Sequence, residues 1–155
     1  MKKNFEKAIF YMNLRAAENG DTKAQYNLAS LYENGEEIEK NLKKAIYWYQ
    51  KAAEGRYIDA QLRLATLYYN GEGTEKSLEK AFYWYQKAAE SDDAKAQHNL
   101  ASLYENGEGI EKNLEKAIYL YQKAAENGHI GAQYNLATLY YDRKETGKNL
   151  EKTLY

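Results

Sequence analysis

Residues 24–54, AQYNLASLYENGEEIEKNLKKAIYWYQKAAE, decide the fold of this chain because they return almost unchanged further along it. Residues 96–126 repeat this stretch with only four differences among 31 positions. The pair Ala-Gln also returns every 36 residues, at Ala24-Gln25, Ala60-Gln61, Ala96-Gln97 and Ala132-Gln133. A fixed period of this size is typical of an array of stacked structural units.

Each period carries the pattern of two helices joined by turns. In residues 24–32 the apolar side chains recur at helical spacing and form one stripe. Gly35 follows, and glycine there permits the left-handed backbone that ends many helices. Asn41 precedes the next apolar stretch, and its side chain can accept hydrogen bonds from free helix amides. The pattern predicts helices at 4–18, 22–34, 42–54, 58–70, 78–90, 94–106, 114–126, 130–142 and 148–155.

A pair of antiparallel helices cannot bury both apolar stripes by itself, so each hairpin must pack on the next. The sequence therefore predicts an all-α protein, an α-solenoid of stacked antiparallel helix hairpins. We expect a single repeat domain over 1–155. It comprises a partial repeat at 4–20 that holds only the second helix, repeats at 21–56, 57–92 and 93–128, and an incomplete repeat at 129–155.

Composition and charge exclude several classes of function. The 155 residues carry 22 Lys and Arg against 23 Asp and Glu, so no basic field favours a nucleic acid or an anionic membrane. The chain has no Cys, which removes thiolate metal sites and cysteine nucleophiles and fits a reducing compartment. No apolar run is long enough to span a bilayer. We expect a cytoplasmic protein without a cofactor, a nucleic-acid partner or a membrane partner.

The repeated unit resembles the Sel1-like repeat, a relative of the tetratricopeptide repeat. The resemblance is carried by Leu-Ala-x-Leu-Tyr, by the Asn-Gly-Glu-Gly loops at 70–73 and 106–109, and by Lys-Ala-x-x-Trp-Tyr-x-Lys-Ala-Ala. It implies an adaptor scaffold that holds partner proteins and has no enzymatic activity in its repeats. We therefore expect a non-catalytic scaffold that binds a peptide or a partner helix in a concave groove. The alternative is a structural spacer or a self-associating array, either a fragment of a larger protein or an engineered chain, with an empty groove.

Departures from the repeat pattern concentrate in the loops. Glu37 stands where the later loops have glycine, and Arg143 and Glu145 replace both loop glycines of the fourth repeat. Arg56 and Asp92 stand where the turn between repeats has glycine elsewhere. We expect these changes to affect individual loops and the last helix, and to leave the fold intact.

The predicted binding groove lies on the first helix of each hairpin. Steps of 100° along a helix turn the residues two before, two after and five after the buried leucine away from the packed stripe, with the residue one before on the flank. The predicted peptide-binding residues are Tyr26, Asn27, Ser30, Glu33, Leu62, Arg63, Thr66, Tyr69, His98, Asn99, Ser102, Glu105, Tyr134, Asn135, Thr138 and Tyr141.

Two features of this groove have alternative interpretations. The ladder Asn27, Arg63, Asn99 and Asn135 is mostly amide, and an amide can pair with the backbone of an extended peptide. The same side chains could instead satisfy carbonyl groups of neighbouring loops. Tyrosine rings such as Tyr26 could anchor a partner at modest entropic cost, or they could form an ordinary mixed surface.

Catalytic and metal chemistry find little support. His98 and His129 are 31 residues apart, occupy different positions in the repeat and have no Cys beside them, so we expect no metal site. Glu33 and Glu105 are carboxylates, the residue type that serves as acid and base in glycoside hydrolysis. They stand two repeats apart, farther than the ~5–9.5 Å that glycoside hydrolysis requires.

Both ends of the chain carry apolar residues that a terminal repeat would normally replace with polar ones. Phe5, Phe10 and Met12 lie near the start, and Leu154 near the end. They suggest either further repeats in a longer protein or end-to-end association of copies as a homo-oligomer.

Overall fold

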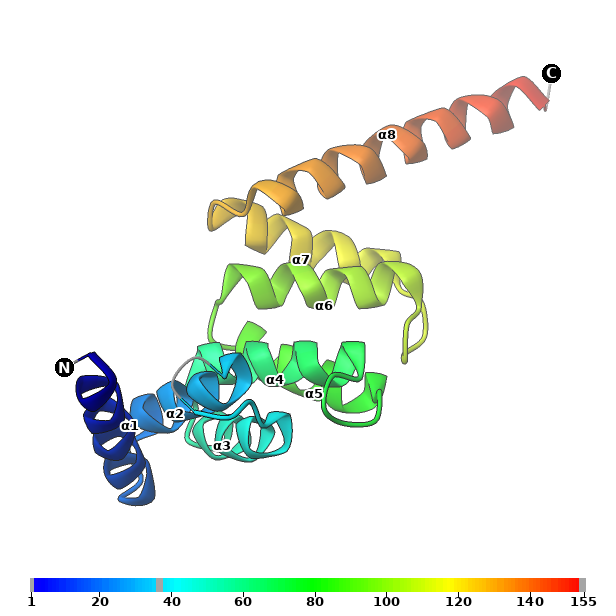
Figure 1. The fold of residues 1–155 in the computed structure, drawn as a ribbon. Coiled ribbons are helices and arrows are strands. Elements are labelled where there is room, and N and C mark those ends of the chain that lie inside the picture. Colours follow the sequence, from blue (N-terminus) through cyan, green and yellow to red (C-terminus); the bar gives the residue numbers. More distant parts are fainter. Residues whose placement is uncertain (1, 36–37, 154–155) are drawn as a thin grey trace. The chain divides into compact units, whose positions relative to one another are not determined.

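The computed structural model of the chain describes residues 2–35 and 38–153, and these form helices joined by turns (Figure 1). The helices are α1 (Lys2–Glu18), α2 (Thr22–Asn34), α3 (Leu42–Glu54), α4 (Ile58–Asn70), α5 (Leu78–Ala89), α6 (Ala94–Asn106), α7 (Leu114–Glu126) and α8 (Ile130–Thr153). From α1 to α7 the bounds agree with the predicted helices to within two residues. The all-α helical-repeat fold is confirmed.

The chain divides into two compact units, Met1–Ala88 and Ala89–Tyr155. In the first unit α1 packs on α2, α2 on α3 and α3 on α4. In the second unit α6 packs on α7 and α7 on α8. The packing thus joins helices that are neighbours in sequence, which is the property that defines a solenoid.

The core of each unit consists of small side chains between helices and large side chains that fill the remaining space. Leu28 and Leu64 are fully buried on α2 and α4. Tyr49 on α3 and Tyr121 on α7 are 1% and 0% exposed. Alanines at the helix crossings, such as Ala45, let the backbones approach closely enough for this packing.

Local capping residues set the helix ends as the sequence predicts. Gly35, Gly71 and Gly107 follow α2, α4 and α6 with φ angles of 71°, 72° and 70°, and their amides bond back to the last turn. Asn41 and Asn113 precede α3 and α7, and their side chains accept from the amide three residues on at 3.0 and 2.9 Å. These contacts satisfy backbone groups that a helix end otherwise leaves unpaired.

The turns between repeats keep a residue with positive φ at one position despite changes of residue. Gly20 and Gly128 have φ angles of 92° and 82°. Arg56 and Asp92 occupy the same position with φ angles of 64° and 60°. A side chain in this left-handed region costs about 1 kcal/mol, so the surrounding hairpins hold the turn in place.

In the first unit, a glutamine near the start of each first helix ties it to the preceding helix. The side-chain amide of Gln25 donates to the Ala17 carbonyl at 3.1 Å, and that of Gln61 donates to the Ala53 carbonyl at 3.1 Å. Both glutamines are buried. The Ala-Gln pair that marks the period therefore has a packing role: the alanine fits the helix contact and the glutamine satisfies a buried carbonyl.

The fourth repeat contradicts the prediction of two helices at 130–142 and 148–155. A single helix, α8, runs from Ile130 to Thr153 through the expected turn, and position 149, expected to cap a helix, lies inside it. The earlier loops turn at two glycines with positive φ, such as Gly71 and Gly73. Positions 143 and 145 hold Arg and Glu instead, and these residues continue a helix more readily than they adopt a left-handed cap.

The missing turn leaves part of α8 uncovered. Tyr140 corresponds to Tyr68, which is 7% exposed, and was expected in the core, yet Tyr140 is 48% exposed. No second helix folds back over it within the described residues. Glu37 and Leu154, which the sequence analysis singled out, lie outside the described residues.

Candidate peptide-binding faces

The sixteen predicted binding residues lie on α2, α4, α6 and α8, four on each helix. We call these four residues the outward stripe of their helix. Asn27, Tyr134, Thr138 and Tyr141 are exposed, and the other twelve are half-buried. None is buried, whereas Leu64, which lies between two of them on α4, is 0% exposed. On α2, α4 and α6 the stripe residues therefore lie off the fully buried face, whereas on α8 Ala137 and Tyr140 of the expected packed face are exposed as well.

In the first unit, Glu33 is at the centre of a network that joins three helices. Its carboxylate accepts a hydrogen bond from the Tyr49 hydroxyl on α3 at 2.7 Å. It also accepts from Nε of Arg63 on α4 at 2.9 Å, and a second guanidinium nitrogen completes the ion pair. Glu72 lies 3.8 Å from the same guanidinium. This network fixes the relative positions of α2, α3 and α4.

The network shifts the pKa values of its members. Burial alone would raise the pKa of Glu33, but the hydrogen bonds from Arg63 and Tyr49 outweigh burial and leave that pKa below its usual value. The pKa of Tyr49 is raised by burial and by the bond to Glu33. The hydrogen bond to Glu33 raises the pKa of Arg63. At neutral pH the network is therefore an ion pair with a neutral tyrosine.

Other stripe residues of the first unit also contact their neighbours. The Tyr26 ring lies 5.5 Å from Tyr49 and 5.2 Å from Tyr57 between centroids. On α4, the Thr66 hydroxyl lies 3.1 Å from the Tyr85 hydroxyl. The Lys76 ammonium lies 5.3 Å from the centre of the Tyr69 ring. The outward stripes of α2 and α4 are thus ordered. Tyr49 on α3 and Tyr85 on α5, the second helices of the two hairpins, contact them.

The second unit contains a related network. The Tyr121 hydroxyl on α7 donates to the Glu105 carboxylate at 2.7 Å. Asn135 on α8 donates to the Tyr121 oxygen at 3.0 Å and lies 3.3 Å from Nε2 of His98. The other ring nitrogen of His98 lies 3.3 Å from the Asn99 side-chain oxygen. Burial and the bond to Glu105 raise the pKa of Tyr121 to about 12.

These contacts bear on the two interpretations of the polar ladder. Arg63 and Asn135 bond to side chains of the preceding hairpin. Neither partner is a loop carbonyl, which was the structural role considered for them. The pairing of tyrosine with glutamate in both networks had a signal in the sequence. Tyr49 follows Glu33 by 16 residues, and Tyr121 follows Glu105 by the same number. Asn27 is exposed on the ladder.

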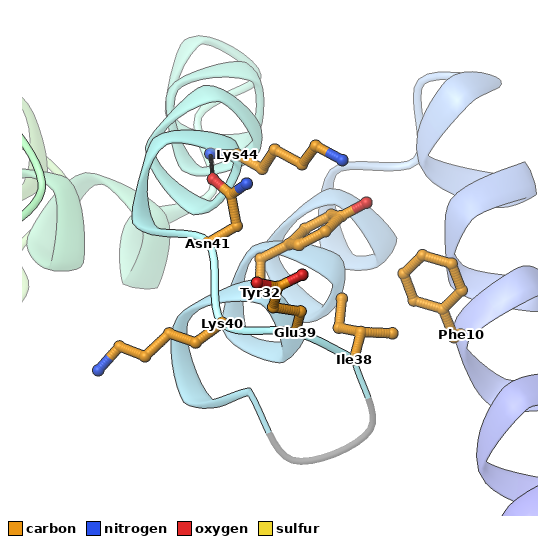
Figure 2. A pocket seen from close by; sticks show the side chains of 7 residues that line it. All are labelled: Phe10, Tyr32, Ile38, Glu39, Lys40, Asn41 and Lys44. Carbon is orange, nitrogen blue, oxygen red and sulfur yellow. Dashed lines mark hydrogen bonds between the residues drawn. The ribbon is translucent and has the colours of Figure 1, made fainter.

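A cavity of about 320 Å³ opens beside α1 and α2 in the first unit (Figure 2). Phe10 points from α1 toward Tyr32, and the two rings meet edge to face at 5.9 Å. Lys44 lies 5.2 Å above the Tyr32 ring. The same lysine-on-tyrosine contact recurs between Lys80 and Tyr68 at 5.0 Å. The cavity lining is therefore largely part of the repeat architecture. Its remaining members are Ile38, Glu39, Lys40 and Asn41.

The two histidines lie together, although they occupy different positions in the repeat. The rings of His98 and His129 stack with centroids 4.5 Å apart and planes 25° from parallel. In the part of the chain that the structure describes, no three His, Cys, Asp or Glu residues gather as metal ligands. Nor does any helix in that part combine the length and apolar character needed to cross a lipid bilayer.

Helix hairpins that repeat every 36 residues and pack on their sequence neighbours define a helical-repeat protein of the α-solenoid class. The sequence matches the Sel1 repeat five times, over residues 1–21, 22–57, 58–93, 94–129 and 130–155, so the chain belongs to the Sel1 repeat family. No curated protein matches the chain in sequence.

Solved structures with the same fold come from several bacteria. A Sel1 repeat protein from Oxalobacter formigenes is 39% identical with a TM-score of 0.82, and the match covers 84% of this chain and 54% of that one. A protective antigen of uropathogenic Escherichia coli with an SLR fold is 33% identical with a TM-score of 0.83, covering 86% and 28%. Helicobacter pylori cysteine rich protein B is 26% identical with a TM-score of 0.68, covering 88% and 98%. The chain thus spans about half of the first protein and less than a third of the second.

Family membership gives a general function. Sel1-repeat proteins are generally protein-interaction scaffolds of a non-catalytic type. Repeats of this kind generally mediate contacts between proteins.

Proposed function

We propose that this chain is a non-catalytic interaction module whose outward stripes bind an extended peptide or a partner helix. The observation that carries the proposal is the exposure of Asn27 on α2, where Leu28 is fully buried, and of Tyr134 and Tyr141 on α8, where Leu136 and Leu139 are partly buried. An amide can exchange hydrogen bonds with any peptide backbone, and a tyrosine ring adds apolar area with a polar tip. A cytoplasmic location is part of the proposal, supported by the absence of cysteine.

The networks beneath the stripes support binding by an ordered surface. Glu33, Tyr49 and Arg63 bond to one another, so they hold the first stripe in place. Side chains that are already ordered lose less conformational entropy when a ligand binds. We therefore assign Asn27, Leu62 and Tyr69 to direct contact in the first unit, and Glu33 and Arg63 to support.

Peptides selected from a random display library on the wild-type chain provide the ligands for a test. For peptides that bind the first unit, we expect the double variant Asn27→Ala/Tyr69→Ala to raise the dissociation constant at least about tenfold. Aromatic anchors contribute disproportionately to binding. Tyr134→Ala/Tyr141→Ala should do the same for peptides that bind the second unit. Fluorescence anisotropy with labelled peptides measures both dissociation constants.

The matched control for both variants is Tyr47→Ala/Tyr83→Ala. These tyrosines are 54% and 51% exposed but lie on the second helix of their hairpins, α3 and α5. The control should bind every selected peptide as tightly as the wild type does. Unchanged affinity in both stripe variants, or an equal loss in the control, would overturn the assignment of the stripes.

A second candidate function is self-association, and the exposed apolar residues of α1 and α8 favour it. On α1, Phe5 and Met12 are 69% and 72% exposed. On α8, Ala137 is exposed, although its counterparts Ala65 and Ala101 are fully buried under a second helix. If α1 of one copy docked on α8 of another, it would cover the exposed apolar face of each helix. In α8 it would replace the second helix that covers the first helix in the other repeats.

Light scattering over a range of concentrations tests this second candidate. If copies associate end to end, the mean mass should rise with concentration in the wild type. Met12→Lys and Ala137→Lys should each reduce the rise, because an ammonium group would be buried without a partner. A wild type that stays monomeric at high concentration would exclude this function and leave the peptide-binding proposal untouched.

A further inference from the structure

One position of the repeat, the residue just before the first helix of each hairpin, changes its chemistry along the chain. Asp21, Tyr57, Asp93 and His129 occupy it in turn. The two aspartates accept a hydrogen bond from the amide three residues on, at 2.7 and 2.9 Å. At the start of α8 the imidazole takes over this role: Nδ1 of His129 accepts from the Ala132 amide at 3.1 Å, and the same amide also donates to the His129 carbonyl at 3.1 Å. A cap made by a carboxylate in two repeats is thus made by a neutral imidazole in the last.

The capping imidazole is stacked on a second imidazole. The His98 ring on α6 lies 4.5 Å from the His129 ring. Gly131 makes room for the stack, since a Cβ there would lie 3.2 Å from Cε1 of His129 and 3.5 Å from Nε2 of His98. The corresponding positions of the other repeats hold Lys23, Asp59 and Lys95. Asn135 holds His98 from α8 through its side-chain amide.

We propose that His129, stacked on His98, is a pH-sensitive cap that holds the start of α8 in place at neutral pH and releases it on acidification. Protonation at Nδ1 removes the lone pair that accepts from the Ala132 amide. It also places a positive charge at a helix N-terminus, where the macrodipole opposes cations. An aspartate cap keeps its acceptor until much lower pH.

The groups around the cap act mostly in the same direction. Burial lowers the pKa of His129, His98 and Lys95 lower it further, and Asp93 alone opposes them. The Tyr121 ring lies 5.5 Å from the His98 ring, and its hydroxyl is neutral and bonded to Glu105. Because the folded-state pKa is depressed, the stabilisation is complete above the unfolded value of about 6.5 and is lost as pH falls through the folded-state pKa.

Amide hydrogen exchange in the full chain, read by NMR and corrected for intrinsic rates, tests the cap. In the wild type, protection of the Ala132 amide should fall about tenfold between pH 7.5 and pH 5, which corresponds to loss of a typical N-cap. The Ala24 and Ala96 amides, capped by aspartate, should keep their protection. In His129→Asp the protection of the Ala132 amide should no longer depend on pH in this range. His129→Asn, which supplies a neutral acceptor, should give the same result.

A second substitution separates the cap from the stack. His98→Tyr introduces the residue found at the equivalent position 26 and removes a neighbouring ionisable ring. The loss of Ala132 protection should persist in this variant but occur at higher pH. Constant protection of Ala132 in the wild type, or an unchanged loss in both His129→Asp and His129→Asn, would overturn the proposal. Neither readout depends on the proposed peptide binding.

Discussion

Replacing Leu64 with alanine is expected to lower the free energy of unfolding by about 2–5 kcal/mol, the usual cost of a large-to-small change in a packed core. Leu64 lies on α4 with 0% exposure, and Ala60, Ala65 and Leu67 on the same helix are equally buried. Fully buried alanines beside it have no side-chain length with which to fill the space that the leucine vacates. Urea denaturation followed by far-UV circular dichroism measures the loss.

Leu62→Ala is the matched control for this prediction. Leu62 is two residues away on the same helix, but it belongs to the outward stripe and is half-buried. Its replacement should cost less than that of Leu64, about 1–2 kcal/mol, since only part of its area is buried and no enclosed cavity is left. Similar losses in the two variants would mean that the outward stripe of α4 is a packed face, and the proposed binding surface would fall with it.

Replacing Glu33 with glutamine is expected to lower the free energy of unfolding by about 1–2 kcal/mol at pH 7, because Arg63 and Tyr49 lose a charged acceptor. The range is modest because the Arg63 side chain is 34% exposed and water screens the pair. The pKa of Glu33 is lowered in the folded state. Its contribution is therefore complete above the unfolded value of about 4.3 and is lost as pH falls through the folded-state pKa.

Measurements at two pH values test this assignment. The difference between the wild type and Glu33→Gln should be largest at pH 7 and should shrink toward pH 3. Glu105→Gln is the control. Glu105 accepts a hydrogen bond from Tyr121 as Glu33 does from Tyr49, but Asn135 stands at the position that corresponds to Arg63 and donates to the Tyr121 oxygen. It should cost less than Glu33→Gln at pH 7. A difference for Glu33→Gln that is the same at both pH values would contradict an ion pair at this site.

The hairpins could be predicted because their signals are local. Each first helix except the last ends at a glycine, and each second helix from α3 on begins after Asn or Ser, so the cap positions can be read along the chain. The leucine stripe then determines which face packs. The continuous helix α8 was predicted wrongly, although the loss of both loop glycines at Arg143 and Glu145 was visible in the sequence. The repeat pattern predicts a turn at this place, but the residues that form the turn in the earlier repeats are absent.

The networks beneath the stripes could not be predicted in the same way, because they join residues on different helices. Glu33 and Arg63 were predicted to face a ligand, and the sequence did not indicate that they also bond to each other. His98 was predicted as a peptide-binding residue, and the pair His98 and His129 was considered only as metal ligands; the two rings stack at the start of α8. In both cases the sequence contained the partners, but only the packing of successive hairpins shows which side chains meet.

The most direct test of peptide binding by the outward stripes is the dissociation constant of a selected peptide for three proteins compared side by side. These are the wild type, Asn27→Ala/Tyr69→Ala and Tyr47→Ala/Tyr83→Ala. The proposal predicts that a peptide of the first unit binds at least about tenfold more weakly to the stripe variant and equally well to the control. Equal affinity for all three proteins would show that the outward stripe of the first unit does not bind the peptide.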